Sequence, residues 1–138
     1  MGSWPDGLTI PPRWTIVSWE TMVLLVDDDE DLVEMFGLLF TRHGISHRRA
    51  HTLAEVKALG PDLGDVTTAI LDVNLGPHQP SGVDVAVWLR ERYAMRIVFI
   101  TGHAPEHPLV RAASGEHGEV LEKPVPTKLL LEIARGNR

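Results

Sequence analysis

Residues 22 to 31 read MVLLVDDDED, an apolar run that ends in consecutive aspartates. Three more apolar runs end in a polar side chain: Asp72 follows TTAIL, Thr101 follows RIVFI and Lys123 follows EVLE. Short apolar runs that alternate with amphipathic stretches are typical of parallel strands in an α/β sheet, and such sheets place their chemistry at the carboxyl ends of the strands. The sequence therefore predicts one pocket that gathers the carboxylates of Asp27, Asp28 and Asp72, the Thr101 hydroxyl and the Lys123 ammonium group.

The composition is that of one globular domain. The chain has 138 residues, of which 43% are hydrophobic and 23% are charged. No apolar run approaches the roughly 20 residues that cross a bilayer, and the first residues lack the basic start and apolar core of a secretory signal. We expect a cytoplasmic protein.

Charge and cysteine content exclude several kinds of chemistry. The chain has no cysteine, which excludes disulfides and thiolate chemistry. Its formal net charge of −6 argues against direct binding to nucleic acid, because the phosphates would repel it. A cation or a basic patch on a partner protein suits this charge better.

From residue 22 onward the chain alternates strand and helix patterns and makes five βα units. The expected strands are Met22–Val26, Ile45–Ala50, Thr67–Leu71, Ile97–Ile100 and Glu119–Leu121. The expected helices run from Glu30 to His43, from Thr52 to Leu59, onward from Gly82, from Pro105 to Ala113, and onward from Pro126. The strand SHRRA is polar enough to lie at an edge of the sheet, whereas the strand before Asp72 is apolar throughout and should be central.

Residues 1–21 do not follow this pattern, so residues 22–138 form the predicted domain. The first segment holds three of the four tryptophans, with three prolines between them: Trp4, Trp14, Trp19, Pro5, Pro11 and Pro12. Two interpretations stay open: a non-native leader, or an arm in which Trp14 or Trp19 packs on this domain or on a second copy, giving a homodimer.

The predicted pocket needs positive charge among its carboxylates. Two like charges about 4 Å apart cost on the order of 4 kcal/mol at an effective dielectric of 20, so Asp27, Asp28 and Asp72 cannot all stay ionised without a cation. All-oxygen ligands with no histidine or cysteine in register favour Mg²⁺ or Mn²⁺. Mg²⁺ usually completes its shell with phosphate oxygens, so the sequence predicts a site for a phosphoryl group.

The chain from Met22 to its carboxyl end resembles the receiver domain of two-component response regulators, the CheY-like family. The resemblance is carried by LVDDDED, ILDVNL, SGVDVAVWLR, FITGH and LEKPV, in order and at family-like spacing. It implies a flavodoxin-like (βα)5 fold, a doubly wound parallel five-stranded sheet in the order 2-1-3-4-5. It also implies a signalling switch in a two-component phosphorelay.

The resemblance assigns roles to the residues of the predicted pocket. Asp72 would accept the phosphoryl group, and Asp28 and Asp72 would ligate Mg²⁺ together with the backbone carbonyl of Asn74. Asp27 would act on the metal through water, while Thr101 and Lys123 would bind phosphoryl oxygens. The peptide bond between Lys123 and Pro124 is expected to be cis.

The implied reaction is transfer from a phosphohistidine of a sensor histidine kinase or histidine phosphotransfer protein to Asp72. The domain would modify only itself, so it is not an enzyme that turns over an outside substrate. Phosphorylation should draw the Thr101 hydroxyl inward and bias the face formed by the segment around Pro105–Ala113, the last strand and the last helix, where a downstream protein would bind.

Several positions depart from the family pattern. The aromatic residue usual three positions before the lysine is Val120, so the readout must differ, and the loop after Asp72 is longer than usual, with Pro77, His78 and Pro80. Fifteen residues follow Lys123, enough for one helix and no DNA-binding effector domain, which predicts either a single-domain regulator or a fragment. By resemblance, Asn74 and His103 flank the line along which water attacks the acyl phosphate.

Two other classes stay open. A pseudo-receiver would keep the fold as a protein-interaction module without phosphorylation. A hydrolase of the haloacid dehalogenase type would use Asp27 as its nucleophile, although Asp31 breaks that family's motif. The residues Asp29 to Asp31 are expected to be a solvated first helical turn, and His43, His47 and His51 are expected to face solvent.

Overall fold

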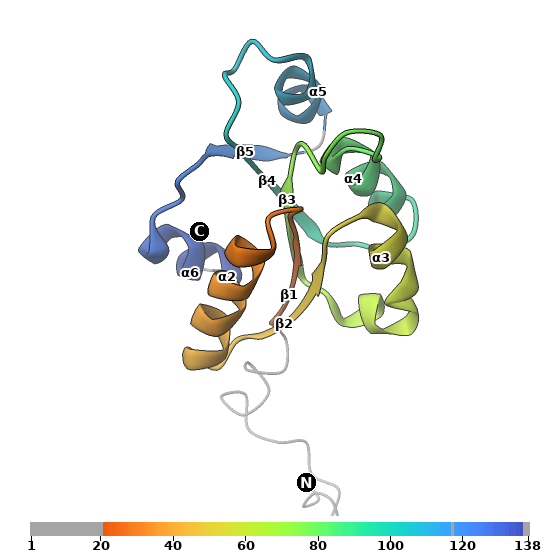
Figure 1. The fold of residues 1–138 in the computed structure, drawn as a ribbon. Helices are drawn as coiled ribbons and strands as arrows, with labels where there is room; N and C mark the ends of the chain where they lie inside the picture. The colour runs from red at the N-terminus through yellow and green to blue at the C-terminus, as the bar shows by residue number, and fades with distance from the viewer. Residues whose placement is uncertain (1–20, 117, 137–138) are drawn as a thin grey trace, which may run out of the picture.

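Five parallel strands form one sheet in the order β2-β1-β3-β4-β5 (Figure 1). The computed structural model describes residues 21–116 and 118–136. The strands are β1 (Met22–Val26), β2 (Ser46–Ala50), β3 (Thr68–Asp72), β4 (Arg96–Thr101) and β5 (Glu119–Glu122). The order confirms the predicted flavodoxin-like sheet, with β1 and β3 at the point where the winding reverses.

Helices cover both faces of the sheet (Figure 1). They are α2 (Glu30–Arg42), α3 (Leu53–Ala58), α4 (Gly82–Arg90), α5 (Pro108–Glu116) and α6 (Thr127–Ala134), with a 3₁₀ helix, η1 (Gly60–Asp65), after α3. The sequence did not predict η1. Residues 1–20, where the predicted arm or leader falls, lie outside the described residues.

The core has two layers because both faces of the sheet are buried. Val23 and Leu25 of β1 point to the side of α2 and α6, whereas Leu24 and Val26 point to the side of α3, α4 and α5. All five residues of β3 are buried, as expected for a central strand. This packing explains why the strands that carry the site read as unbroken apolar runs.

The edge strand β2 is polar, as predicted, but its histidine, His47, is not fully solvent-facing. The ring of His47 lies 5.7 Å from the ring of Phe40 and is half-buried against α2. Burial, supported by the charges of Arg49 and Arg48, lowers the pKa of His47, although its hydrogen bond to the Ile45 carbonyl opposes this. The expectation of an exposed ring was wrong because β2 turns alternate side chains onto the helix.

The helix expected from Pro105 begins three residues later, at Pro108. A turn precedes it, in which the His107 N–H donates to the Ala104 carbonyl. The Leu109 N–H then donates to Nδ1 of His107 at 3.2 Å. Proline suits the first helical position, where no N–H is needed, so the His107 and Pro108 pair fixes the start of α5.

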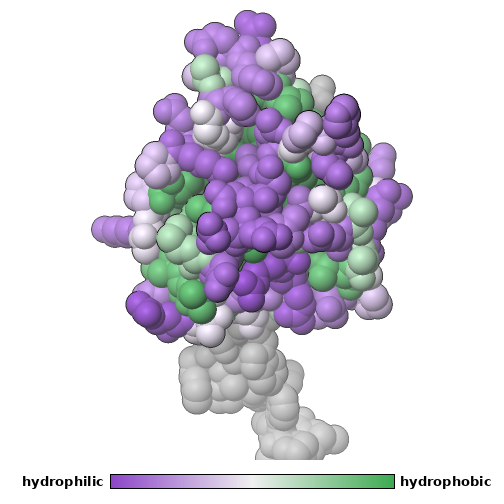
Figure 2. Space-filling view, viewed as in Figure 1, coloured by the Kyte–Doolittle hydropathy of each residue, from purple (hydrophilic) through white to green (hydrophobic). Residues whose placement is uncertain are grey.

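The surface is mostly hydrophilic, with separate apolar areas (Figure 2). Three large apolar side chains are exposed within residues 21–116 and 118–136: Met35 and Leu38 of α2 and Val87 of α4. None of the described helices is long and apolar enough to cross a membrane.

Candidate functional site

The predicted site residues come together at the carboxyl edge of the sheet. Asp27 follows β1, Asp72 ends β3, Thr101 ends β4 and Lys123 follows β5. Carboxylate oxygens of Asp27, Asp28 and Asp72 all lie within 4.8 Å of one another. Parallel pairing produces this cluster, because it brings the carboxyl ends of neighbouring strands to one edge.

The Lys123 ammonium group bridges two of these carboxylates. Its Nζ donates to Oδ2 of Asp27 at 2.9 Å and to Oδ2 of Asp72 at 3.2 Å. Asp27 is fully buried and Asp72 exposes 5% of its surface, so both carboxylates have little water to stabilise their charge. The cis peptide bond between Lys123 and Pro124, expected from the resemblance to receiver domains, is present.

One lysine does not offset two buried carboxylates. Burial, with the charge of Asp27 added to it, raises the pKa of Asp72 to about 7 although Lys123 acts in the opposite direction. Burial also disfavours the charged form of Lys123, but its hydrogen bond to Asp27 and the charges of Asp72 and Asp27 outweigh burial and raise its pKa. An additional positive charge near Asp27 and Asp72 would therefore be electrostatically favourable.

The donor set fits a hard divalent cation. Carboxylate oxygens come from three aspartates, and Asp28 lies at the exposed side of the cluster. Oδ1 of Asp27 accepts a hydrogen bond from the Asp29 N–H at 3.0 Å, and Oδ1 of Asp72 accepts one from the Asn74 N–H at 3.3 Å. Oxygen ligands of this kind suit Mg²⁺. Asp29 is not a member of this cluster and caps α2, since its Oδ1 accepts the Asp31 and Leu32 N–H groups.

A polar chain leads from Thr101 to the loop after β3. The buried Thr101 hydroxyl oxygen accepts the His103 N–H at 2.9 Å. Nδ2 of Asn74 lies 3.2 Å from Nε2 of His103, and Oδ1 of Asn74 accepts the Gly76 N–H. The His103 ring stacks on His107, with 4.3 Å between centroids. Both residues that were predicted to flank the acyl phosphate are therefore in direct contact.

The first turn of α4 holds the end of β3. The Gly82 N–H donates to the Val73 carbonyl at 2.8 Å, and a Cβ on Gly82 would lie 2.0 Å from the Asp72 carbonyl oxygen. Ser81 and Asp84 form a reciprocal capping box that starts the helix. Neither contact was predicted from the sequence, although the spacing S-x-x-D is a signal for the cap.

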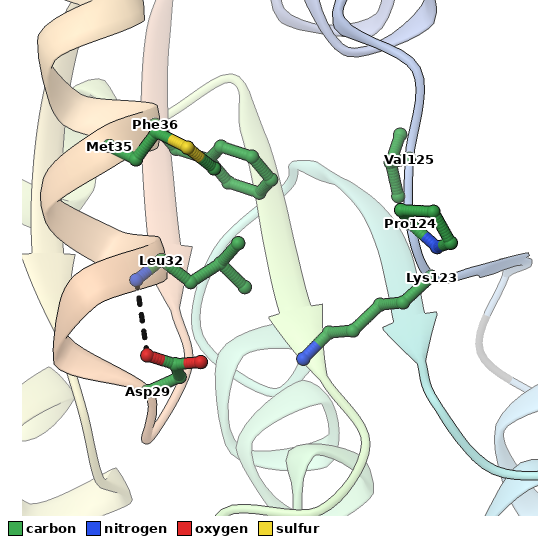
Figure 3. A pocket seen from close by; sticks show the side chains of 7 residues that line it. All are labelled: Asp29, Leu32, Met35, Phe36, Lys123, Pro124 and Val125. Atoms are coloured by element: carbon green, nitrogen blue, oxygen red, sulfur yellow. Dashed lines mark hydrogen bonds between the residues drawn. The ribbon is translucent and has the colours of Figure 1, made fainter.

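An apolar pocket of about 400 Å³ opens beside Lys123 (Figure 3). Leu32, Met35 and Phe36 of α2 form one wall, and Pro124 and Val125 form the wall across from it. The Lys123 side chain extends along the lower edge toward the end of β3. Apolar surface therefore lies directly next to the acidic cluster.

A second pocket, of about 310 Å³, lies between α5 and β5. It is lined by residues from both elements and from the loop after β4: Thr101, His103, Pro105, Val110, Ser114, Val120, Leu121 and Glu122. Val120, at the position usually aromatic in the family, is half-buried on its wall. The small side chain leaves this space next to Thr101.

A family model, the response regulator receiver domain, matches residues 23–135. The chain belongs to this family. Receiver domains act in two-component systems, interact with histidine kinases or phosphotransfer proteins, and bind Mg²⁺ at an aspartate cluster. They are signalling modules, in agreement with the strand-end cluster described above.

Similar proteins include the C4-dicarboxylate transport transcriptional regulatory protein DctR of Rhodobacter capsulatus, 32% identical over 113 residues that make up 81% of this chain. The receiver chain spans 57% of the length of that relative. A response regulator of Burkholderia pseudomallei, solved with a phosphorylated aspartic acid, calcium ion and citrate, matches with a TM-score of 0.69 at 25% identity, covering 81% of this chain and 65% of that one.

A CheY-like receiver domain of Methylobacillus flagellatus gives a TM-score of 0.69 at 21% identity over 86% of this chain and 98% of its own. At that identity the likeness supports the fold alone. Membership of the receiver family argues against the hydrolase interpretation.

Proposed function

We propose that this receiver domain is a phosphorylation-dependent switch that accepts a phosphoryl group on Asp72. The observation that carries the proposal is the Lys123 ammonium group bonded to both Asp27 and Asp72 beside Asp28 at the mouth of the cluster. A nucleophilic carboxylate, two acidic neighbours and a positively charged group are what phosphoryl transfer to an aspartate requires.

The donor is a phosphohistidine of a sensor histidine kinase or histidine phosphotransfer protein. An Asp72 carboxylate oxygen attacks phosphorus, the P–N bond breaks, and the imidazole nitrogen keeps the electron pair and takes up a proton. Asp72 must be ionised for this step. Lys123 favours the ionised form, and its ammonium group then stays within reach of the oxygens of the new acyl phosphate.

Asp28, Asp72 and the backbone carbonyl of Asn74 would hold Mg²⁺, with Asp27 acting through a water. When bound, Mg²⁺ supplies positive charge for the phosphoryl oxygens in the transition state. The raised pKa of Asp72 supports this assignment, because burial and the neighbouring charge of Asp27 both disfavour the ionised carboxylate and a cation there would offset both.

The readout starts at Thr101. Its hydroxyl oxygen now accepts the His103 N–H, so turning the hydroxyl toward a phosphoryl oxygen breaks that bond. The loop that follows, with the His103 and His107 stack, then loses an anchor next to the pocket at Val120. We infer that the face of α5, β5 and α6 carries the change to a downstream protein.

The phosphodonor approaches over the pocket between α2 and Val125. That surface lies next to Lys123 and offers apolar contact from Leu32, Met35 and Pro124. A protein that covers it also shields the acidic cluster from water during transfer.

Intact-mass analysis after incubation with acetyl phosphate and Mg²⁺ tests the proposal. The wild type should gain one phosphoryl adduct and Asp72→Asn should gain none. Asp29→Asn is the matched control, because asparagine keeps the α2 cap and should leave the adduct unchanged. An adduct on Asp72→Asn would refute Asp72 as the acceptor, and an unmodified wild type would favour a pseudo-receiver.

A further inference from the structure

One exposed stripe of α2 carries acidic, apolar and basic side chains in turn. Asp31, Met35, Leu38 and Arg42 follow one another at spacings of four, three and four residues, which aligns them along one side of the helix. All four side chains are exposed, and Met35 and Leu38 expose 57% and 64% of their surface. Figure 2 shows apolar surface beside hydrophilic surface in the region of α2, at the lower left.

The helix by itself explains only part of this pattern. An acid in the first turn and a base in the last turn both suit the helix dipole, which accounts for the signs of Asp31 and Arg42. Neither side chain forms an ion pair within the described part of the chain. The dipole gives no reason for two large apolar side chains in water between them, and apolar surface of this kind marks interaction sites.

The stripe is self-complementary about its own midpoint. Met35 and Leu38 lie equally far from the point midway between Phe36 and Gly37, and so do Asp31 and Arg42. A second α2 laid antiparallel across this midpoint would therefore place Leu38 of the partner subunit on Met35. It would also place Arg42 of the partner subunit opposite Asp31, each charge about 8 Å along the helix from the axis.

We propose that this stripe is a self-association surface, through which two copies of the chain pair α2 against α2, antiparallel, about a two-fold axis. A two-fold interface needs one patch that complements itself, and the order acid, apolar, apolar, base supplies it. The apolar pair would lie at the centre of the contact and the charges at its rim, the usual anatomy of an interface. Each pairing occurs twice by symmetry.

The dimer would limit access to the site. Met35 is also part of the wall of the pocket beside Lys123, so a copy packed on α2 and a phosphodonor packed on that pocket exclude each other. The self-association itself needs no phosphorylation and is measured on the unmodified chain. Its failure and a failure of the proposed phosphoacceptor role are therefore distinguishable.

Sedimentation velocity of the full chain, from about 10 µM to about 1 mM, measures the association. A single helix pair buries less than the roughly 800 Å² per partner of a standard interface, so we expect a weak dimer with a dissociation constant on the order of 100 µM. Asp31→Arg and Arg42→Asp each place like charges opposite one another. Each variant alone should weaken the dimer by on the order of tenfold.

Mixing the two variants is the decisive measurement. The Asp31→Arg chain is basic at positions 31 and 42, and the Arg42→Asp chain is acidic at both positions. When one copy of each variant pairs, position 31 of either chain therefore faces the opposite charge at position 42 of the other. An equimolar mixture should therefore regain the wild-type affinity. Circular dichroism and thermal melting check that each variant is folded. Arg111→Asp, an equivalent charge reversal on the exposed face of α5, should leave the association unchanged.

Three results would overturn the proposal. The first is a wild-type chain that stays monomeric at about 1 mM, which would mean that the stripe on α2 binds a different protein. The second is a dimer that both charge reversals leave intact or that their mixture does not restore. The third is a dimer that Arg111→Asp disrupts as strongly, since that would locate the interface on α5.

Discussion

The side-chain amide of Asn74 lies 3.2 Å from Nε2 of His103 and joins the loops that follow β3 and β4. Oδ1 of Asn74 accepts the Gly76 N–H, so Nδ2 faces the imidazole and donates to it. Stacking on His107 holds the other side of the ring. The pair therefore links the two loops, two residues beyond Asp72 on one side and two residues beyond Thr101 on the other.

Removing the His103 ring should shorten the life of the phosphorylated form. We predict that His103→Ala speeds loss of phosphate from Asp72 by about fivefold, the change in rate that lowering the barrier by about 1 kcal/mol produces. The physical reason is steric: without the ring, water reaches the acyl phosphate more easily. The decay of the adduct, followed by mass spectrometry near neutral pH, measures the rate.

His107→Ala is the informative companion variant. It removes the stacking but keeps the bond between Asn74 and His103, so it should speed decay less than His103→Ala does. Slower decay in His103→Ala would indicate that the imidazole orients the attacking water. An unchanged rate would remove His103 from the mechanism.

The fold and the charged cluster could be predicted because both follow from the apolar runs that form the buried parallel strands. Buried parallel strands need unbroken apolar runs, and parallel pairing brings the residues after Val26, Leu71 and Glu122 to one edge. The strand ends differ from their expected positions by at most one residue, which does not separate Asp27, Asp72 and Lys123.

Details that depend on loops could not be predicted in this way. The contact between Asn74 and His103 joins two loops whose paths have no periodic pattern to read. The start of α5 moved because a side chain, His107, accepts the Leu109 N–H, a bond that helical spacing does not reveal. The missed capping box of Ser81 and Asp84 did have a sequence signal.

The raised pKa of Asp72 predicts how stability depends on pH. The folded pKa is about 7 and the unfolded pKa is about 3.8, so the folded state binds the proton more tightly between these values. Ionisation of Asp72 therefore costs stability fully above pH 7, and this cost disappears as the pH falls toward 4. Asp72→Asn should be more stable than the wild type at pH 8 and should lose this advantage at low pH.

Thermal melts of both proteins from pH 4 to pH 8.5, without divalent cations, measure the difference. We expect the variant to melt higher at pH 8 by at least roughly 3 to 6 °C, the change that about 1 kcal/mol produces in a domain of this size. Saturating Mg²⁺ should stabilise the wild type and reduce the gap. A difference that does not vary with pH would contradict the assignment of the raised pKa to Asp72.

Metal binding should depend on Asp28 far more than on its neighbour. Asp28 lies in the carboxylate cluster, whereas Oδ1 of Asp29 already caps α2. We predict that Asp28→Ala weakens Mg²⁺ by at least tenfold and that Asp29→Ala weakens it by less than about twofold. The Asp29 variant should instead lose about 1 kcal/mol of stability with its cap, and Asp29→Asn should lose little. Equal losses of Mg²⁺ affinity, measured by calorimetric titration, would place the metal elsewhere.

The close approach of Gly82 to Asp72 predicts a backbone dependence of the site. A methyl group at position 82 would lie 2.0 Å from the Asp72 carbonyl oxygen and 2.8 Å from its carbon, and backbone atoms cannot move aside as a flexible side chain can. We predict that Gly82→Ala costs about 2 to 3 kcal/mol of stability and slows phosphorylation by acetyl phosphate, because the end of β3 must shift.

Gly115→Ala, in α5 with no atom within 4 Å of the added methyl group, is the matched control and should be neutral or slightly stabilising. Urea unfolding and the rate of adduct formation separate the two effects. Wild-type stability and rate in Gly82→Ala would mean that α4 can move away from β3 without disturbing Asp72.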